Sequence, residues 1–343
     1  MQTSLKTRDT GSLQACRCKC AKIVQIKLEA ENSASINSSL PGLPFFGSNC
    51  QIMQNTPYTT LITVDQLKTL RRTESPGAPG LMVFDCSFDL MKPESGEAAY
   101  LQAHIPGAVY VHLDRDLSDK SGHGVNGGRH PLPSRENFAA WLGRIGFDNS
   151  MQAVVYDRQG ANYCGRLWWM LKWAGHDNVA LLDGGFQAWQ ATEEVSAALP
   201  AARGTSPFSL KPALARLVDT ESVEGNLGRP AQTLVDARAA PRFRGEVEPL
   251  DAVAGHIPGA LNRPFAQNIG ADGKFKPAAV LRAELDALLA GRDPATVVHH
   301  CGSGVSAVPN VIAMELAGLG RTALYAGSWS EWSSNPSHAF AQG

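Results

Sequence analysis

The chain carries one residue pattern twice, and this repeat limits what it can fold into more than any other feature. The segment 103–108 reads Ala-His-Ile-Pro-Gly-Ala, and 152 positions later 255–260 reads Gly-His-Ile-Pro-Gly-Ala. A second match, offset by 143 positions, pairs Asp-Gly-Gly-Phe-Gln-Ala-Trp at 183–189 with Ala-Gly-Ser-Trp-Ser-Glu-Trp at 326–332. Self-similarity over such a distance indicates two copies of one domain.

The repeat divides the chain into its expected parts. The two copies fill 57–195 and 213–343, and the stretch 196–212, rich in Ala, Pro, Gly and Ser, is predicted to link them. Residues 1–52 are polar, Ser-rich and poorly periodic, so we expect a poorly ordered extension there. Because ordered pattern begins directly after Met53, that residue is a candidate for the true start of the protein.

Strands and helices alternate in both copies. Short apolar runs that end in Asp, such as 81–85 and 233–236, are typical of strands. The segment 277–290 is typical of a helix, since its leucines share one face, a proline occupies its first turn and Gly291 ends it. This alternation predicts an α/β fold of two domains, each a mainly parallel sheet covered by helices on both faces. Functional groups are then expected at the carboxyl ends of the strands.

The composition argues against several classes of protein. Hydrophobic residues make up 43% of the 343 residues, and the formal net charge is -1, from 31 Lys and Arg against 32 Asp and Glu. A protein that binds nucleic acid without sequence preference carries a basic excess, so no nucleic-acid partner is expected. A membrane-spanning helix needs a long apolar run that this sequence lacks, so no membrane partner is expected either.

The cysteine pattern bears on location, metals and cofactors. Seven cysteines, an odd number in a long chain, do not suit a disulfide framework and favour a reducing, cytoplasmic location. The cluster at 16–20, Cys-Arg-Cys-Lys-Cys, resembles a metal motif, but no second Cys/His pair follows at finger spacing, so no metal site is expected. No nucleotide-binding glycine fingerprint is present, and no cofactor is expected.

The chemical centre of the chain is predicted at Cys301. It follows the apolar strand 296–298 and opens the loop Cys301-Gly302-Ser303-Gly304-Val305-Ser306, before a helix expected over 307–319. Glycines at alternate positions allow backbone N–H groups to turn inward as an anion cradle, and the helix amino terminus adds positive potential. A thiol in this position is expected to act as a thiolate nucleophile, with a buried structural cysteine as the alternative.

Two thiolate chemistries use such a loop. A tyrosine-phosphatase-like site needs an arginine six positions after the cysteine, and Ala307 stands there. The loop from Cys301 to Ala307, the two His-Ile-Pro-Gly segments and the terminal Gly-Ser-Trp-Ser-Glu-Trp at 327–332 resemble the tandem-domain rhodanese sulfurtransferases, and above all their 3-mercaptopyruvate-using members. Ser306 stands where those members usually have Thr. Thiosulfate-using relatives usually carry cations at the two positions after the cysteine.

The resemblance implies a proton relay at the interface between the copies. Asp114 and His130 match the family positions that act with Ser303. Asp114 follows the first His-Ile-Pro-Gly segment, and His130 lies at the end of the stretch 121–130, where the first copy has nine extra residues. A solvated glycine loop is the alternative for this stretch, and His123 is the local competitor of His130.

The resemblance also implies arginines that bind the donor. Arg242 matches the family's substrate-carboxylate position, and Arg244 lies two residues further on. Family members usually have a second arginine shortly afterwards, whereas 246–251 contains none, and Arg263 is a candidate replacement. On the residues alone, surface arginines on a loop are the alternative. The remaining expected substrate-binding residues belong to the nucleophile loop and are Gly302, Gly304, Val305 and Ser306.

The first copy is expected to be catalytically blank. Arg158 aligns with Cys301, and Cys164 falls in the following helix rather than on the loop. His104 and His256 occur at matching positions of both copies, including the blank one, and are therefore expected to be structural.

The sequence thus predicts a sulfurtransferase that needs no cofactor. A sulfane sulfur would pass from 3-mercaptopyruvate to a Cys301 persulfide, and then to an acceptor such as a small thiol, thioredoxin or cyanide. The alternative enzyme is a thiosulfate sulfurtransferase, which kinetics with both donors would distinguish. The alternative from another class is a non-catalytic rhodanese-like sulfur-carrier or binding module, against which the intact Cys301 loop argues.

Overall fold

The computed structural model describes residues 57–73 and 80–343. Both copies of the repeat belong to one compact unit that spans 55–343. The predicted extension 1–52, with its four cysteines, and the candidate start Met53 lie outside the described residues. Among the helices that are described, none is both long and apolar enough to cross a membrane.

The first copy folds around a five-stranded parallel sheet. Its strands are β1 (Leu61–Ile62), β2 (Leu81–Asp85), β3 (Val109–Tyr110), β4 (Gln152–Tyr156) and β5 (Val179–Leu182). They lie in the order β1-β5-β4-β2-β3. Every residue of the three central strands is buried, as expected for a parallel sheet that is covered on both sides.

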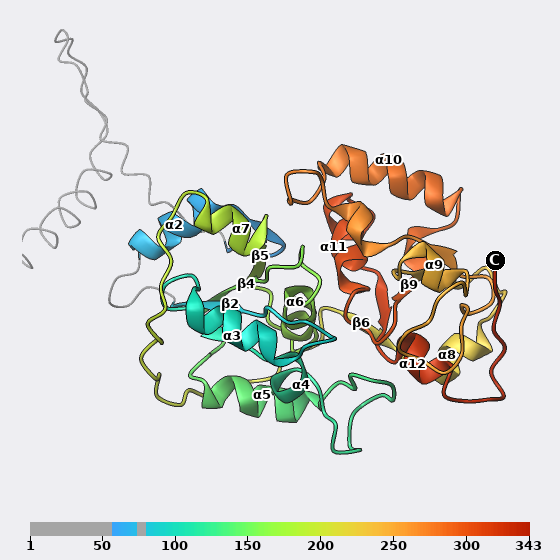
Figure 1. Cartoon of the computed structure of the whole chain (residues 1–343), viewed down its shortest axis with the longest axis horizontal. Helices are drawn as coiled ribbons and strands as arrows, with labels where there is room; N and C mark the ends of the chain where they lie inside the picture. Colours follow the sequence, from blue (N-terminus) through green and yellow to red (C-terminus); the bar gives the residue numbers. More distant parts are fainter. Residues whose placement is uncertain (1–56, 74–79) are drawn as a thin grey trace, which may run out of the picture. The chain divides into compact units, whose positions relative to one another are not determined.

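Helices cover both faces of this sheet (Figure 1). They are α2 (Val64–Thr73), α3 (Glu94–Gln102), α4 (Leu113–Asp116), α5 (Arg135–Arg144), α6 (Cys164–Trp173) and α7 (Gly185–Gln190). Met82 and Phe84 of β2 belong to the hydrophobic cluster formed with α5 and α6, whereas Leu81 and Val83 belong to the cluster formed with α2 and α7. This division follows from the two-residue period of a strand, which points successive side chains to opposite faces.

The second copy repeats this topology strand for strand. Its strands are β6 (Arg216–Val218), β7 (Thr233–Asp236), β8 (Leu261–Asn262), β9 (Val297–His300) and β10 (Ala323–Tyr325). They are parallel and lie in the order β6-β10-β9-β7-β8, so the second sheet has the strand order of the first. The predicted fold class of two α/β domains with mainly parallel sheets is confirmed.

Helices also cover both faces of the second sheet. The helical segments are α8 (Thr220–Gly225), α9 (Ala240–Phe243), η1 (Phe265–Asn268), α10 (Ala278–Leu289), η2 (Pro294–Thr296), α11 (Val308–Leu316) and α12 (Ser328–Trp332). Val223 and Trp329 pack α8 and α12 on one face, while Leu285 and Met314 pack α10 and α11 on the other. α10 ends just before Gly291, as predicted, and this glycine has a φ of 83°.

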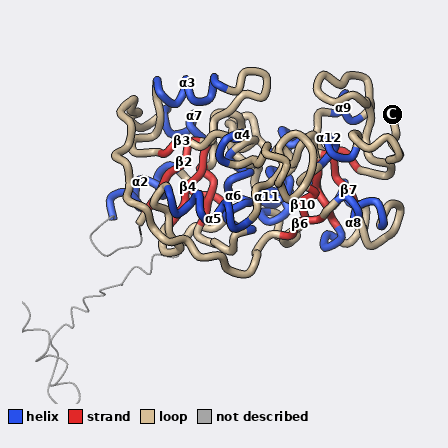
Figure 2. Tube along the Cα trace, turned by 90° about the horizontal axis from the view of Figure 1, so that it is seen from below, coloured by secondary structure: helices blue, strands red, loops and turns tan. Residues whose placement is uncertain are grey.

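The two domains share a hydrophobic core, because α6 of the first packs against α11 of the second (Figure 2). All ten residues of α6 are buried, including Trp168, Trp169 and Trp173. A Cβ at Gly165 would lie only 3.3 Å from Cγ1 of Val308, so the helices approach closely at this glycine. The tryptophans therefore fill the core and the interface, and this interface brings the loops of the two domains together.

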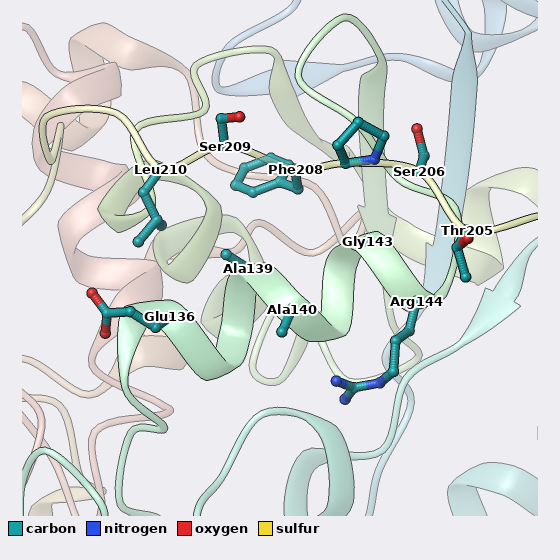
Figure 3. Close-up of a pocket in the computed structure, with 11 residues that line it drawn as sticks. Glu136, Ala139, Ala140, Gly143, Arg144, Thr205, Ser206, Phe208, Ser209 and Leu210 are labelled. Carbon is teal, nitrogen blue, oxygen red and sulfur yellow. The ribbon is translucent and has the colours of Figure 1, made fainter.

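The segment predicted to link the domains runs along α5 (Figure 3). The N–H of Ser206 donates to the carbonyl oxygen of Gly143 at 2.9 Å, and Ser209 exchanges two hydrogen bonds with the side chain of Asn149. A pocket lies between α5 and residues 205–210, and it contains none of the predicted site residues. This part of the connection is thus bound to the first domain.

Candidate active site

Cys301 lies between the end of β9 and the start of α11, and its side chain is buried. Its backbone N–H donates to Oγ of Ser328 at 3.1 Å, and its carbonyl oxygen accepts from the N–H of Trp329 at 3.0 Å. Ser328 has a φ of 56°, in the left-handed region, and its Oγ also donates to the carbonyl oxygen of Tyr325. The terminal Gly-Ser-Trp segment, which belongs to the repeat and to the family resemblance, therefore anchors the start of the nucleophile loop.

The loop after Cys301 has backbone N–H groups without an internal partner. Gly304 has a φ of 73°, and a Cβ there would overlap the backbone of Ala326, so this position requires glycine. Within the described part of the chain, the N–H groups of residues 302–306 make no hydrogen bond. Since α11 follows directly and adds the positive potential of its amino terminus, the loop has the arrangement of an anion cradle.

The equivalent loop of the first domain has its N–H groups occupied by an internal carboxylate. The side chain of Asp157, directly after β4, accepts hydrogen bonds of 2.8 to 3.0 Å from four backbone N–H groups, those of Gln159, Ala161, Tyr163 and Cys164. His300 stands at the aligned position of the second domain, so the cradle there lacks this carboxylate. The difference between the two loops supports an anion-binding geometry for the loop of the second domain. It also supports a first domain that is catalytically blank.

The other reactive side chains of the first domain are buried or held in structural hydrogen bonds. Cys86 and Cys164 are buried, and burial is the main cause that raises the pKa of both thiols well above its ordinary value. Arg158, which aligns with the nucleophile, donates from Nη1 to Asp85 at 2.8 Å and to Ser87 at 2.6 Å. Neither thiol is therefore placed to react as a thiolate.

The two repeated histidines have matching structural contacts. Nδ1 of His104 lies 2.8 Å from the carbonyl oxygen of Tyr100, and the two rings stack. Nδ1 of His256 lies 2.8 Å from the carbonyl oxygen of Phe243, and these rings stack as well. The same contact in both domains supports the structural role expected for this pair.

The first domain places His130 against Ser303 of the second. Nδ1 of His130 and Oγ of Ser303 are 2.7 Å apart, and Nε2 of His130 is 3.3 Å from Oδ1 of Asp114. Asp114 also pairs with Lys120 at 2.7 Å. The structure thus brings the three expected relay residues into one series of contacts, whereas the competing His123 is exposed.

Burial and opposite charge set the protonation of this relay. Burial lowers the pKa of His130, and the nearby Asp114 carboxylate only partly opposes this effect. The hydrogen bond with His130, together with the contact to Lys120, lowers the pKa of Asp114 well below its usual range. At neutral pH the pair is therefore a neutral imidazole oriented by an ionised carboxylate, which is the state of a general base.

A buried arginine that the sequence analysis did not identify connects the loops of the two domains. Arg166 of α6 donates to the carbonyl oxygen of His130 at 2.9 Å and to that of Gly304 at 3.2 Å. Burial lowers the pKa of Arg166 to about 10, so the guanidinium stays charged at neutral pH. Its neighbours on α6 are mostly apolar, so the sequence around it indicated only a core helix.

Arg242 lies beside the nucleophile loop, where the resemblance placed it. A Cβ at position 302 would lie 3.5 Å from Nη1 of Arg242. Nη2 of Arg242 pairs with Glu248 at 2.6 Å and lies 3.4 Å from Asp251. The segment in which family members usually have a second arginine therefore supplies two carboxylates in this chain.

The other two candidate arginines are not brought to the loop. Arg244 pairs at the surface with Glu246, at 2.6 Å. Arg263 is buried next to β8, where its Nε donates to Asn268 and its Nη2 pairs with Glu284 of α10, both at 2.9 Å. Because these contacts hold its guanidinium in the packing around η1 and α10, Arg263 does not take the place of the missing second arginine.

A different arginine lies next to Arg242. Nη2 of Arg129 lies 3.2 Å from the position that a Cβ of residue 302 would take, and its Nη1 pairs with Asp251 at 2.8 Å. Arg129 directly precedes His130 in the glycine-rich stretch of the first domain. Its position next to a predicted relay residue is the one feature of the sequence that indicated Arg129.

Comparison with known proteins decides the family. The Rhodanese-like domain family matches residues 63–192 and again residues 219–335, which together make up most of the chain. The chain belongs to the rhodanese-like family. Both of its α/β domains are rhodanese-like domains, in agreement with the repeat and with the resemblance of the Cys301 loop.

Several relatives that match nearly the whole repeat are named as sulfurtransferases. A probable 3-mercaptopyruvate sulfurtransferase of Pseudomonas aeruginosa is 44% identical over 289 residues, which cover 82% of this chain and 98% of that protein. A putative thiosulfate sulfurtransferase of Mycobacterium tuberculosis is 42% identical over 294 residues, which cover 82% and 97%. The solved 3-mercaptopyruvate sulfurtransferase of Leishmania major matches with a TM-score of 0.69 at 28% identity, over 80% of this chain and 74% of that one.

These relatives confirm the prediction of an enzyme of the sulfurtransferase class. Their names divide between two sulfur donors, 3-mercaptopyruvate and thiosulfate. The choice of donor for this rhodanese-like enzyme therefore depends on the chemistry of its own site.

Proposed function

We propose that the enzyme moves a sulfane sulfur from 3-mercaptopyruvate, through a persulfide on Cys301, to a thiol or cyanide acceptor. The observation that carries the proposal is the 2.7 Å contact between His130 and Ser303, because it brings a proton relay to the nucleophile loop. Gly302 and Ser303 add no cationic side chain to that loop. Proton transfer is what the mercaptopyruvate reaction needs, whereas fixed cations beside the nucleophile favour the dianion thiosulfate.

In the first step, the Cys301 thiolate attacks the sulfur of the donor. An S–S bond forms to Cys301 while the C–S bond of mercaptopyruvate breaks, and the electron pair of that bond leaves with the carbon fragment as the enolate of pyruvate. The N–H groups of residues 302–306 stabilise the negative charge on the persulfide. Because the electron pair stays within the reactants, the step needs no oxidant, reductant or cofactor.

The proton that pyruvate gains is the thiol proton of the donor. Ser303 passes this proton to Nδ1 of His130. Nδ1 can accept it when the neutral imidazole carries its own proton on Nε2, directed at the Asp114 carboxylate. The Asp114 carboxylate stabilises the imidazolium that forms. The same two groups then return the proton to the methylene carbon of the enolate.

Arg242 is the group proposed to bind the carboxylate of the donor. Its side chain is 19% exposed, so it can be reached from solvent, and a guanidinium can bind a carboxylate through two parallel hydrogen bonds. Glu248 and Asp251 offset part of the positive charge next to it. This balance favours a donor with a single negative charge over a dianion.

In the second step, an acceptor attacks the outer sulfur of the persulfide. The S–S bond breaks, its electron pair returns to Cys301 as the thiolate, and the acceptor leaves as a persulfide or, from cyanide, as thiocyanate. Small thiols and reduced thioredoxin both supply a suitable nucleophile. The cytoplasmic location predicted from the cysteine pattern would give the enzyme access to them.

Thiosulfate is the second candidate donor, because guanidinium groups lie close to the nucleophile even though the loop itself carries none. A non-catalytic carrier module is disfavoured by the second cradle, whose N–H groups have no internal carboxylate such as Asp157.

A single-turnover experiment tests the proposal. The enzyme is mixed with each donor in the absence of acceptor, and the mass of the peptide that contains Cys301 is measured, followed by kcat/KM for both donors. We expect a gain of one sulfur and a higher kcat/KM with mercaptopyruvate. Cys301→Ser should abolish both while leaving the fold intact, because serine cannot hold a persulfide. An equal or higher kcat/KM with thiosulfate would promote the second donor, and turnover by Cys301→Ser would move the nucleophile elsewhere.

A further inference from the structure

We propose that Arg166, a buried side chain of the first domain, is the fixed positive charge that keeps Cys301 ionised and orients the loop around it. The inference rests on the proposed function, since it takes Cys301 as the nucleophile. Arg166 is 0% exposed, so it does not meet the donor and acts as a positioning residue through the nucleophile loop. The first domain, which lacks a nucleophile, then sets the reactivity of the nucleophile in the second domain.

Three backbone carbonyl groups hold the guanidinium against the loop. Nη1 of Arg166 donates to the carbonyl oxygen of Gly304 at 3.2 Å, and Nη2 donates to those of His130 at 2.9 Å and Leu117 at 3.3 Å. In a trans peptide group the C=O and the N–H point in opposite directions, so the bond to Gly304 turns the N–H of Val305 away from Arg166. That N–H makes no hydrogen bond with any described residue. Arg166 thus keeps one N–H of the cradle oriented and free for an anion.

The guanidinium carries a charge that no carboxylate balances. Among the residues that the structure describes, no Asp or Glu side chain pairs with Arg166, and its buried Nε makes no hydrogen bond. A charge that is removed from water is costly unless an opposite charge and hydrogen bonds compensate it. Burial lowers the pKa of Arg166 to about 10, and the negative charge of Cys301 opposes this fall. Ionised Cys301 is therefore the counter-charge of Arg166.

The two domains differ at this position as their cradles do. The offset of 143 residues that relates the two loops places Pro309 of α11 at the position of Arg166 in α6. Pro309 faces α6, since a Cβ at Gly165 would lie 3.7 Å from its Cδ. It brings neither a charge nor an N–H donor to the first domain, where the Asp157 carboxylate occupies the cradle. The arginine thus accompanies the cradle that lacks an internal carboxylate.

The test follows the ionisation of Cys301 in variants of Arg166. The protein is treated with iodoacetamide over a range of pH, and the rate of modification is measured from the mass of the peptide that contains Cys301. This reagent is neutral and has no carboxylate, so its reaction reports the thiolate without a contribution from Arg242. In Arg166→Met and Arg166→Gln, the midpoint of the pH profile should rise by about one pH unit or more, because the loss of a nearby opposite charge disfavours the anion. Below the midpoint, the modification rate at a given pH should fall about tenfold.

Arg166→Lys separates the charge from the hydrogen bonds. Lysine keeps the positive charge but not the planar fork, whereas glutamine keeps N–H donors without the charge. We therefore expect the midpoint of Arg166→Lys to stay within about half a pH unit of the wild type, while Arg166→Gln shifts as far as Arg166→Met. If circular dichroism shows that neither uncharged variant folds, the profile of Arg166→Lys decides. A rise of a full pH unit in Arg166→Lys would overturn the inference, because the charge is still present there.

Lys172→Met is the matched control. Lys172 is another buried cation of α6, where it pairs with Asp177, and its removal takes an equal charge from the same helix. Asp177 keeps its contact with Arg321, at 3.2 Å, so this variant should fold and leave the midpoint unchanged. An equal shift in Lys172→Met would overturn the inference, since the effect would then come from the packing of α6. An unchanged midpoint in folded Arg166→Met would overturn it as well. A wild-type enzyme that gains no sulfur on Cys301 from mercaptopyruvate would instead refute the proposed function.

Discussion

Ser303→Ala separates the two candidate donors, because it removes one atom from the proposed relay. Oγ of Ser303 is the group found 2.7 Å from Nδ1 of His130, and both side chains are buried. The substitution leaves that nitrogen without the hydroxyl in a site that water does not readily reach. An unpaired buried polar group costs about 1–3 kcal/mol, so the variant should be less stable by roughly that amount but still folded.

The loss of activity should depend on the donor. Pyruvate leaves as an enolate that must take a proton, and positioned proton transfer contributes about 100- to 10,000-fold to a rate, so turnover of mercaptopyruvate should fall within that range. Sulfite, the leaving group from thiosulfate, is stable as an anion at neutral pH. Turnover of thiosulfate should therefore change less than about tenfold, which corresponds to the loss of a single hydrogen bond in the loop.

The assay measures pyruvate release and thiocyanate formation on the same preparations. Ser87→Ala is the matched control, since its buried hydroxyl accepts a hydrogen bond from Arg158 in the blank domain. It should cost similar stability without a loss of turnover. A parallel fall for both donors in Ser303→Ala would refute the reasoning, because Ser303 would then shape the loop rather than transfer a proton.

Four further changes test other parts of the molecule. Arg242→Ala should raise KM for mercaptopyruvate roughly 10- to 150-fold with little change in kcat, and an unchanged KM would remove this residue from the donor site. Gly304→Ala should destabilise the fold by about 3 kcal/mol or more, because the added Cβ would overlap the backbone of Ala326, and an unchanged melting temperature would contradict this. Burial lowers the pKa of His176 to about 4, so the unfolded chain binds a proton that the folded chain excludes. The free energy of unfolding should therefore decline as pH falls from about 6.5 towards 4. In urea unfolding, the free energy of unfolding of the wild type should differ between pH 7 and pH 5, and His176→Gln should make this difference smaller by roughly 1–2 kcal/mol. A variant with the same pH dependence as the wild type would contradict this. A chain that begins at Met53 should keep full activity and stability, since 1–52 carries neither the repeat nor a periodic apolar pattern, and loss of either property would show that the extension contributes.

Much of the fold could be predicted because its signals are local. The leucines that mark α10 recur every three to four residues, and Ser134, a residue type that favours helix N-caps, caps α5 with an Oγ that accepts from the N–H of Asn137. The strand expected at 81–85 is β2. The repeat strengthened each of these predictions, since a pattern seen in one copy could be checked in the other.

The composition of the candidate site was harder to predict because its contacts join distant parts of the chain. Arg129 and Gly302 are 173 positions apart, and only the packing of α6 on α11 brings their loops together. The direction of the Arg263 side chain depends on Asn268 and Glu284, which no motif specifies. The nucleophile, by contrast, lies on a continuous loop whose glycines are visible in the sequence.

The occupied cradle of the first domain has a consequence for how this enzyme can change. Because Asp157 occupies the N–H groups of its own loop, the first domain has no free cradle for a persulfide. Selection on this domain then acts through the residues that it contributes to the site of the second domain. If His130 serves the donor as proposed, substrate preference is inherited in part with the half of the gene that encodes no nucleophile. Exchanging that half between homologous enzymes, with the Cys301 loop untouched, would then be a direct way to transfer donor selectivity.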